Sequence, residues 1–181
     1  MSRREQILAT AADLFAARGF HGVSVVDLGA ACGISGPALY KHFASKDAVL
    51  AEMLVSISER LLEVGRERAA AAADAEEAVR ALVDWHVDFA LRHRSLIVVQ
   101  DRDWESLPGE ARELVRTLQR EYVDVWAARL CEVHAALQLA QGRAMAHAAF
   151  GLINSTPHSS LLADDLMRDL LTRMALDALG V

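Results

Sequence analysis

The chain has 181 residues, is 53% hydrophobic with three prolines and ten glycines, and carries a formal net charge of −6. This length suits one or two small domains with a sizeable core, and the abundance of alanine, leucine and arginine favours an all-helical protein. We expect a soluble cytoplasmic protein without a membrane partner, because no apolar run approaches the roughly 18 residues of a membrane span, no signal peptide is visible, and Cys32 and Cys131 are too far apart to suggest a disulfide framework.

The charge is unevenly distributed along the chain. Residues 1–48 contain five Lys/Arg and four Asp/Glu, whereas the remainder contains fourteen against twenty-one. The negative total argues against indiscriminate binding to nucleic acids, so any nucleic-acid contact is expected in the first segment. The two lysines of the chain, Lys41 and Lys46, both lie there.

A first helix is predicted from Arg3 to Arg18, where apolar residues recur at helical spacing. Gly19 ends it. Arg3 and Arg4 at its start have two interpretations that the sequence leaves open. They form either an ordinary solvated terminus or a short basic arm that reaches a phosphate or the minor groove.

The stretch from Ser24 to Lys46 predicts two short helices joined by a glycine turn. Ser24 caps the first helix, with Asp27 in its first turn, and Gly33 supplies the left-handed exit. Ser35 caps the second helix, and Leu39 with Phe43 points into a core. The outward positions are then Gly36, Pro37, Ala38, Tyr40, Lys41 and His42. This arrangement is a helix-turn-helix, whose second helix can enter a DNA major groove.

This segment resembles the DNA-binding domain of the TetR-type transcriptional repressors. The residues that carry the resemblance, over about residues 3–55, are Gly19-Phe20, Ser24, Gly33-Ile34-Ser35, Leu39 to Phe43, and Lys46 with Leu50. The resemblance implies an all-α protein of about nine helices. Residues 1–48 would be the helix-turn-helix domain, and residues 49–181 a larger helical domain for effector binding and dimerisation. It also implies a DNA-binding regulator and homodimer without catalytic residues or a cofactor.

The resemblance implies distinct DNA roles for nine side chains. Phosphate contacts are expected from Ser24, Tyr40, His42 and Lys46, and they set register and salt dependence. The groove floor is expected to meet Ser35, Gly36, Pro37, Ala38 and Lys41. Chance is the alternative explanation for the position of Lys41 and Lys46 in this segment, but the surrounding motif favours contact with DNA phosphates.

Helical periodicity continues through the rest of the chain. Ser45 caps a long helix that breaks near 73–74, and further helices are expected at 74–92, from 95 to a break at 107–109, at 108–137, 138–154 and 160–178. Small residues share one face of the 138–154 helix: Ala140, Ala144, Ala148, Gly151 and Ser155. With the leucine-rich last helix, they suggest a face that packs on a second copy. Tight packing within one chain is the alternative.

Aromatic and polar residues of the second domain are the candidates for a small-molecule site. They are Trp85, His86, Phe89, Asp101, Trp104, Tyr122, Trp126, His147 and Phe150. An apolar pocket with a few polar groups is the usual form of such a site, so a largely apolar, acyl-type effector is compatible with them. Aromatic residues at helical spacing are, however, more often plain core.

Other classes of function have weaker support. His86, His93, Asp101, Asp103 and His147 are residue types that bind zinc or nickel, but no ligand pair has the spacing of a metal motif, and core histidines are favoured. Cys32 is expected to be a small buried hydrophobe rather than a redox sensor. The sequence contains no nucleophile–base motif that would indicate an enzyme. An activator, or a constitutive regulator without an effector, remains the main alternative to a ligand-released repressor.

Overall fold

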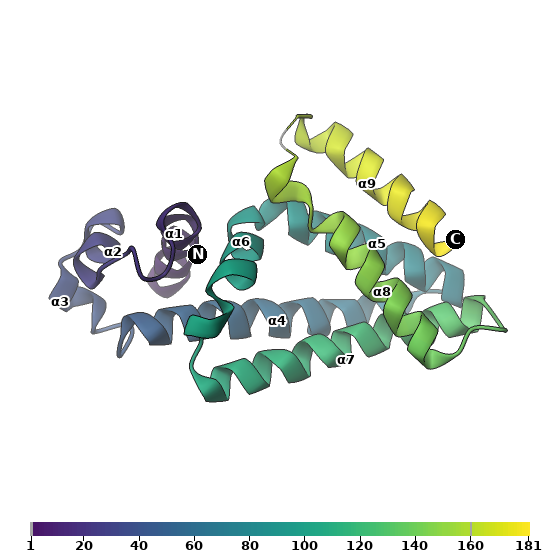
Figure 1. The fold of residues 1–181 in the computed structure, drawn as a ribbon, viewed down its shortest axis with the longest axis horizontal. Coiled ribbons are helices and arrows are strands. Elements are labelled where there is room, and N and C mark those ends of the chain that lie inside the picture. Colours follow the sequence, from purple (N-terminus) through teal and green to yellow (C-terminus); the bar gives the residue numbers. More distant parts are fainter. Residues whose placement is uncertain (1, 160) are drawn as a thin grey trace. The chain divides into compact units, whose positions relative to one another are not determined.

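The computed structural model describes residues 2–159 and 161–181 (Figure 1). These residues form nine α-helices and two short 3₁₀ helices, without a strand. The α-helices are α1 (Arg3–Arg18), α2 (Val25–Ala31), α3 (Gly36–Leu39), α4 (Lys46–Ala71), α5 (Ala75–Arg92), α6 (Arg94–Asp103), α7 (Gly109–Val133), α8 (Leu139–Ile153) and α9 (Asp164–Leu179). The 3₁₀ helices are η1 (Trp104–Ser106) and η2 (Thr156–His158).

Most of the observed helix boundaries agree with those predicted from the sequence. α1 has the predicted ends, and Asp74 caps α5 by accepting a hydrogen bond from the Glu77 amide. α7 ends at Val133 rather than at residue 137. The expected start of the last helix at Ser160 lies outside the described residues, and α9 itself begins at Asp164. α3 is shorter than expected, because the chain leaves the helix at Tyr40 and continues in turns.

The chain divides into two compact units. Unit 1 consists of Met1–Ile57 and Ser95–Val115, and unit 2 of Ser58–Arg94 and Arg116–Val181. α4 and α7 therefore each contribute one part to unit 1 and the other part to unit 2.

Unit 1 is built around one hydrophobic core. α1 contributes Ile7 and Phe15, α2 contributes Leu28, and the segment from α3 contributes Leu39, all of them at most 1% exposed. Leu50 and Leu54 of α4 and Val99 of α6 complete this core. The core fixes α2 and α3 against α1 and the start of α4, and burial of each large side chain stabilises the unit by about 2 kcal/mol.

In unit 2, α5 packs against both α8 and α9, and α8 packs against α9 (Figure 1). The largest buried side chain is Trp126 of α7, which lies in the same unit as buried Leu82, Ile153 and Leu179. α7 and α8 approach closely at Gly142, where an added Cβ would lie 3.0 Å from the Ala127 carbonyl oxygen. Among the described residues, no helix is long and apolar enough to cross a membrane.

Candidate functional site

The first candidate site is the α2–turn–α3 segment of unit 1. Ser24 and Asp27 form a capping box, in which each side chain accepts a hydrogen bond from the other residue's backbone amide. The hydrogen bonds from Ser24 to its carboxylate lower the pKa of Asp27. Gly33 has a φ of +67°, as the predicted left-handed exit requires. The local sequence therefore sets the turn that separates the two helices.

Gly29 explains how closely α2 and α3 approach. A Cβ at this position would lie 2.9 Å from both the Gly36 nitrogen and the Ile34 carbonyl oxygen. Such a distance to backbone atoms is too short for any residue with a side chain. Gly29 lowers the intrinsic helix propensity of α2, but it makes the tight helix-turn-helix packing sterically feasible.

α3 and the turns after it present a surface of small and polar side chains. Ser35, Pro37, Tyr40 and Lys41 are exposed, and Tyr40 is 56% exposed. Gly36, Ala38 and His42 are half-buried, and Ser24 is exposed. Seven of the nine predicted DNA-contact residues, 35–38 and 40–42, thus lie on one continuous segment of unit 1, in which Leu39 and Phe43 are buried. The second helical turn expected for a recognition helix is here a series of turns.

Lys46 has a structural role that the sequence did not indicate. Its ammonium group donates hydrogen bonds to the carbonyl oxygens of Phe20 (2.7 Å) and Val23 (2.8 Å) and lies 4.2 Å from the centre of the Phe20 ring. An ammonium group has three donors, so one remains for a phosphate. Lys46 therefore ties the start of α4 to the α1–α2 connection.

The two N-terminal arginines also have partners within unit 1. Arg4 forms an ion pair with Glu52, donates to the His42 carbonyl oxygen, and lies over the Phe43 ring. Arg3 donates to the Cys32 carbonyl oxygen. These contacts hold the start of α1 against the segments that follow α2 and α3, rather than leaving the two side chains as a free arm.

The second candidate site is an aromatic cluster in unit 2, formed by His86, Phe89, Tyr122, Trp126 and Phe150. The rings of His86 and Phe150 are stacked with centroids 4.4 Å apart, and Phe150 lies 5.5 Å from Tyr122 and 5.0 Å from Trp126. Phe89 lies 5.7 Å from His86. The structure therefore brings together five of the nine side chains that the sequence proposed for an effector site, from α5, α7 and α8.

His86 is the polar centre of the aromatic cluster. It is 3% exposed, its Nε2 lies 3.2 Å from Asn154 Oδ1, and its Nδ1 lies 3.4 Å from the Tyr122 hydroxyl. Because the amide oxygen can only accept, Nε2 carries the proton, and Nδ1 accepts from the tyrosine. Burial lowers the pKa of His86 to about 4. The imidazole is consequently neutral near pH 7.

Tyr122 and Trp126 contribute the other polar groups of the cluster, a phenol hydroxyl and an indole N–H. Burial raises the pKa of the Tyr122 phenol above its usual range. The indole N–H of Trp126 lies close enough to this phenol to oppose that rise, but it makes no hydrogen bond of normal geometry with any described residue. Buried donors normally have a partner, so this N–H can accommodate an oxygen atom of a bound molecule.

Gly65 of α4 allows the Tyr122 ring to lie directly against the helix backbone. A Cβ at Gly65 would lie 2.5 Å from Tyr122 Cε2 and 3.1 Å from Cδ2. Sequence reasoning missed this residue, because a glycine inside a helix shows no partner in the sequence. The contact connects the aromatic cluster with α4.

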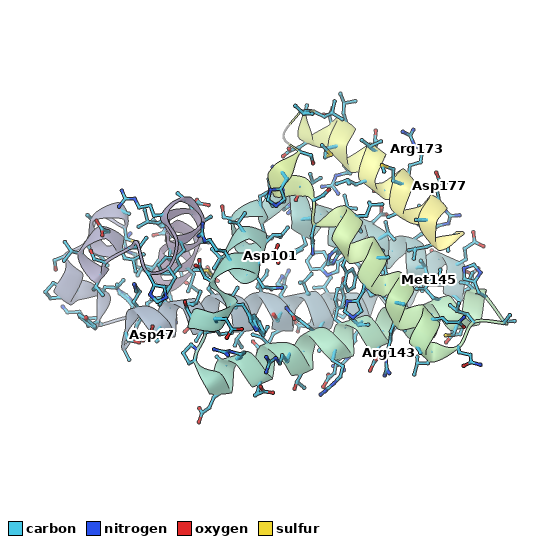
Figure 2. The ribbon with its side chains drawn as sticks, in the orientation of Figure 1. Asp47, Asp101, Arg143, Met145, Arg173 and Asp177 are labelled. Atoms are coloured by element: carbon cyan, nitrogen blue, oxygen red, sulfur yellow. The ribbon has the colours of Figure 1, made fainter. Side chains whose placement is uncertain are left out.

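The other four predicted effector residues lie outside the cluster. Trp85 is half-buried, donates to the Leu61 carbonyl oxygen, and lies under Arg68. His147 is exposed, with its ring 6.3 Å from that of Phe150. Asp101 (Figure 2) and Trp104 belong to unit 1, where Asp101 is exposed and Trp104 packs on the hydrophobic core.

No metal centre is formed by the described part of the chain. There, no three His, Cys, Asp or Glu side chains converge to hold an ion. Cys32 and Cys131 are both free and half-buried.

Two family models match the chain. "Bacterial regulatory proteins, tetR family" matches residues 7–53, and "Tetracyclin repressor-like, C-terminal domain" matches residues 72–158. The first model covers the helix-turn-helix, and the second covers the segment that carries the aromatic cluster.

Individual relatives agree with these matches. The HTH-type transcriptional repressor KstR2 of Rhodococcus jostii (strain RHA1) is 30% identical over 125 residues, which are 68% of this chain and 61% of that protein. The HTH-type transcriptional activator FasR of Mycolicibacterium smegmatis is 31% identical over 87 residues, 48% of this chain and 40% of that protein. The chain thus spans less than two thirds of these curated relatives. The crystal structure of a TetR-family transcriptional regulator from Bordetella parapertussis 12822 superposes with a TM-score of 0.84, at 26% identity over 96% of this chain and 94% of that chain.

Proposed function

The chain belongs to the tetR family of bacterial regulatory proteins, and on this basis we propose that it is a ligand-responsive, dimeric, DNA-binding transcriptional regulator of the cytoplasm. Residues 1–48 bind DNA, and residues 49–181 bind the effector and the second subunit. In this proposal the protein represses transcription and is released from a palindromic operator when a largely apolar effector binds.

The observation that carries the proposal is the exposed α3 segment on a rigid support. Pro37, Tyr40 and Lys41 are exposed above buried Leu39 and Phe43. The small side chains of Gly36, Pro37 and Ala38 allow the backbone to approach the groove floor and thymine methyl groups, whereas Lys41 can donate to guanine. Base-edge donors are few, so specificity rests partly on DNA shape.

The exposed faces of α8 and α9 support the second subunit in this proposal. Ala140, Ala144, Ala148, Gly151 and Ser155 are all exposed, and a Cβ at Gly151 would meet no atom within 4 Å. These five small residues are therefore not used for tight packing within the described chain. On α9, Leu166 is 55% and Met174 is 45% exposed. A second copy would bury both faces and place two recognition segments about 34–36 Å apart on DNA.

The aromatic cluster supports an effector of largely apolar character. Its rings offer stacking and dispersion contacts, and the Trp126 N–H offers one hydrogen-bond donor to an oxygen such as that of an acyl group. An effector that displaces Tyr122 would also act on α4, because the ring lies against Gly65. α4 starts in the core of unit 1 with Leu50 and Leu54. A coupling of about 1–3 kcal/mol is typical for such transmission.

An activator is the second candidate, since one of the matched relatives, FasR, is named an activator. The position of the operator relative to the promoter decides between repression and activation.

Selection from a random duplex library tests the proposal directly. The purified full chain is bound to the library at low salt, and the retained duplexes are sequenced. We expect one enriched palindromic site. Absence of any enriched sequence, together with absence of binding at low salt, would refute DNA recognition. A single non-palindromic half-site would refute the dimeric part alone.

A further inference from the structure

We propose that Val26 recognises a thymine of the operator by contacting the C5-methyl group of that base. This inference rests on the proposed function, because it assigns a specificity-determining residue to the same DNA-binding surface. Val26 lies on α2, outside the α3 segment that is expected to meet the groove floor. The proposal therefore extends base recognition from α3 to α2 and names the base that α2 prefers.

Val26 has an unusual degree of exposure for an aliphatic side chain of unit 1. Its exposed fraction is 70%, the largest among the large hydrophobic side chains described in that unit. Its neighbours on α2 contribute to the hydrophobic core, on which Val25 packs and in which Leu28 is buried. Single exposed apolar residues are common on protein surfaces, so the exposure acquires a functional meaning only from the position of Val26.

Val26 lies directly beside the first residue of α3. A Cβ on Gly36 would lie 3.6 Å from Val26 Cγ2 and 3.7 Å from Val26 Cα, which is ordinary van der Waals contact. α2 and α3 pack against each other (Figure 1), and the missing side chain of Gly29 allows this close approach. Because Gly36 has no side chain that could cover Cγ2, Val26 and exposed Pro37 belong to one apolar edge of the DNA-binding surface.

The exposed part of α2 offers apolar contacts and no side-chain hydrogen bonds. Its exposed residues are Val26, Ala30 and Ala31. Asp27 is the one charged residue of the helix, and its half-buried carboxylate lies 3.6 Å from the Arg18 guanidinium. No exposed side chain of α2 can therefore donate to a base edge or pair with a phosphate.

The chemistry of the major groove then indicates thymine. Guanine, adenine and cytosine present acceptors and amino groups in this groove, whereas thymine adds a C5-methyl group. An aliphatic side chain cannot satisfy the polar groups, but its contact with a methyl group removes apolar surface of both partners from water. Val26 consequently favours thymine at the base pair that it faces, and the recognised group is the methyl.

Removal of single methyl groups from the operator tests the proposal. Selection from the random duplex library with the wild-type full chain supplies the operator. Each thymine is then replaced by deoxyuridine, which lacks only the C5-methyl group, at both symmetric positions of the palindrome. Fluorescence anisotropy gives the Kd of every duplex for the wild type, for Val26→Ala and for the control Leu114→Ala. Leu114 is 44% exposed on α7 in unit 1, outside the helix-turn-helix.

One symmetric pair of deoxyuridines should weaken binding of the wild type by about tenfold or more. Loss of one buried methyl contact corresponds to about fourfold for each half-site, and the operator has two half-sites. Val26→Ala should bind the unsubstituted operator more weakly by a similar factor and should lose nothing further at this pair. Leu114→Ala should retain the wild-type penalty. The melting temperature of Val26→Ala should equal that of the wild type, because the truncated side chain is exposed.

A cytosine series provides a second readout of the same contact. At the sensitive position, the T·A pair is replaced by a C·G pair or by a pair of 5-methylcytosine with guanine. Both replacements change the hydrogen-bonding groups of the base pair in the same way, but 5-methylcytosine restores a methyl group on C5. The wild type should bind the methylated duplex about tenfold more tightly than the unmethylated one, whereas Val26→Ala should bind the two equally.

Two results would overturn the proposal. In the first, no pair of deoxyuridines weakens binding of the wild type. In the second, Val26→Ala shows the same penalty as the wild type at every pair, whether it binds as tightly as the wild type or uniformly more weakly, as a contact of Val26 with the sugar-phosphate backbone would cause. With an enriched palindrome in hand, both results leave the proposed function intact. A wild type that enriches no sequence and binds no DNA at low salt refutes the proposed function, and this inference with it.

Discussion

In unit 1 the side chains predicted to meet DNA lie at the surface, whereas in unit 2 the polar groups of the aromatic cluster are buried. Tyr40 is 56% exposed, but His86 is 3% and Tyr122 is 4% exposed. Exposed groups contribute little to stability, so changing them should alter binding alone. Buried groups are part of the core, so changing them should alter binding and stability together.

The largest expected effect concerns the protonation of His86. The unfolded chain takes up a proton near pH 6.5, whereas the folded state takes it up only near pH 4, because burial lowers the pKa of His86 to about 4. The resulting contribution to stability is therefore complete above pH 6.5 and is lost as the pH falls from 6.5 to 4. A shift of this size corresponds to about 3 kcal/mol.

Urea unfolding of the wild type and of His86→Phe at pH 7 and pH 4.5 measures this contribution. The phenyl ring preserves the stacking on Phe150 but cannot titrate, so the variant should lose much less stability on acidification. Exposed His158 provides the control, and His158→Asn should follow the wild type. An equal pH dependence of His86→Phe and the wild type would show that this imidazole is hydrated in the folded protein.

The same contrast explains what the sequence could predict. The helix-turn-helix is local, because its caps, its glycine turn and its outward positions all lie within about twenty residues, and Ser24, Gly33 and Ser35 adopt the roles that their chemistry indicates. The aromatic cluster is assembled from distant parts of the chain, between residues 86 and 150. Helical periodicity therefore predicted that its members face the protein interior, but not that they contact one another. Asp101 and Trp104 matched the pattern equally well and yet belong to unit 1.

Close approach of helices was the least predictable feature. In the sequence, Gly29 only lowers the helix propensity of α2. In the structure, it lies so close to the Gly36 nitrogen that no Cβ would fit. Gly65 was missed for a related reason. Its role depends on which residue of another helix lies opposite, and the spacing along one helix does not carry that information.

The second prediction concerns the contact between Gly65 and Tyr122. Gly65→Ala places a Cβ 2.5 Å from Tyr122 Cε2 in a buried site, so the cost of overpacking, about 1–3 kcal/mol, should exceed the gain of about 1 kcal/mol in helix propensity. We expect a net loss of up to about 2 kcal/mol in the free energy of unfolding, measured by urea titration, and an altered effector response.

A double-mutant cycle sharpens this test. In a Tyr122→Ala background the clash is removed, so Gly65→Ala should become neutral or stabilising. Gly109→Ala is the control, since a Cβ there meets no atom within 4 Å. An equal loss of stability from Gly65→Ala in both backgrounds would show that the Tyr122 ring is not the partner of Gly65.

The smallest expected effects separate the two lysines of unit 1. Lys41 is exposed, so Lys41→Ala should leave the melting temperature unchanged and reduce the salt dependence of DNA binding by up to about one phosphate contact. Lys46 donates to the Phe20 and Val23 carbonyl oxygens, so Lys46→Ala should also lower the stability, by about 1 kcal/mol.

Thermal unfolding measures the stability of each variant, and operator binding at several salt concentrations measures the salt dependence. If Lys46→Ala reduces the salt slope without changing the melting temperature, its main role is the phosphate contact that the family resemblance implies. If it lowers the melting temperature without changing the salt slope, the main role of Lys46 is to stabilise the helix-turn-helix through its hydrogen bonds to the Phe20 and Val23 carbonyl oxygens.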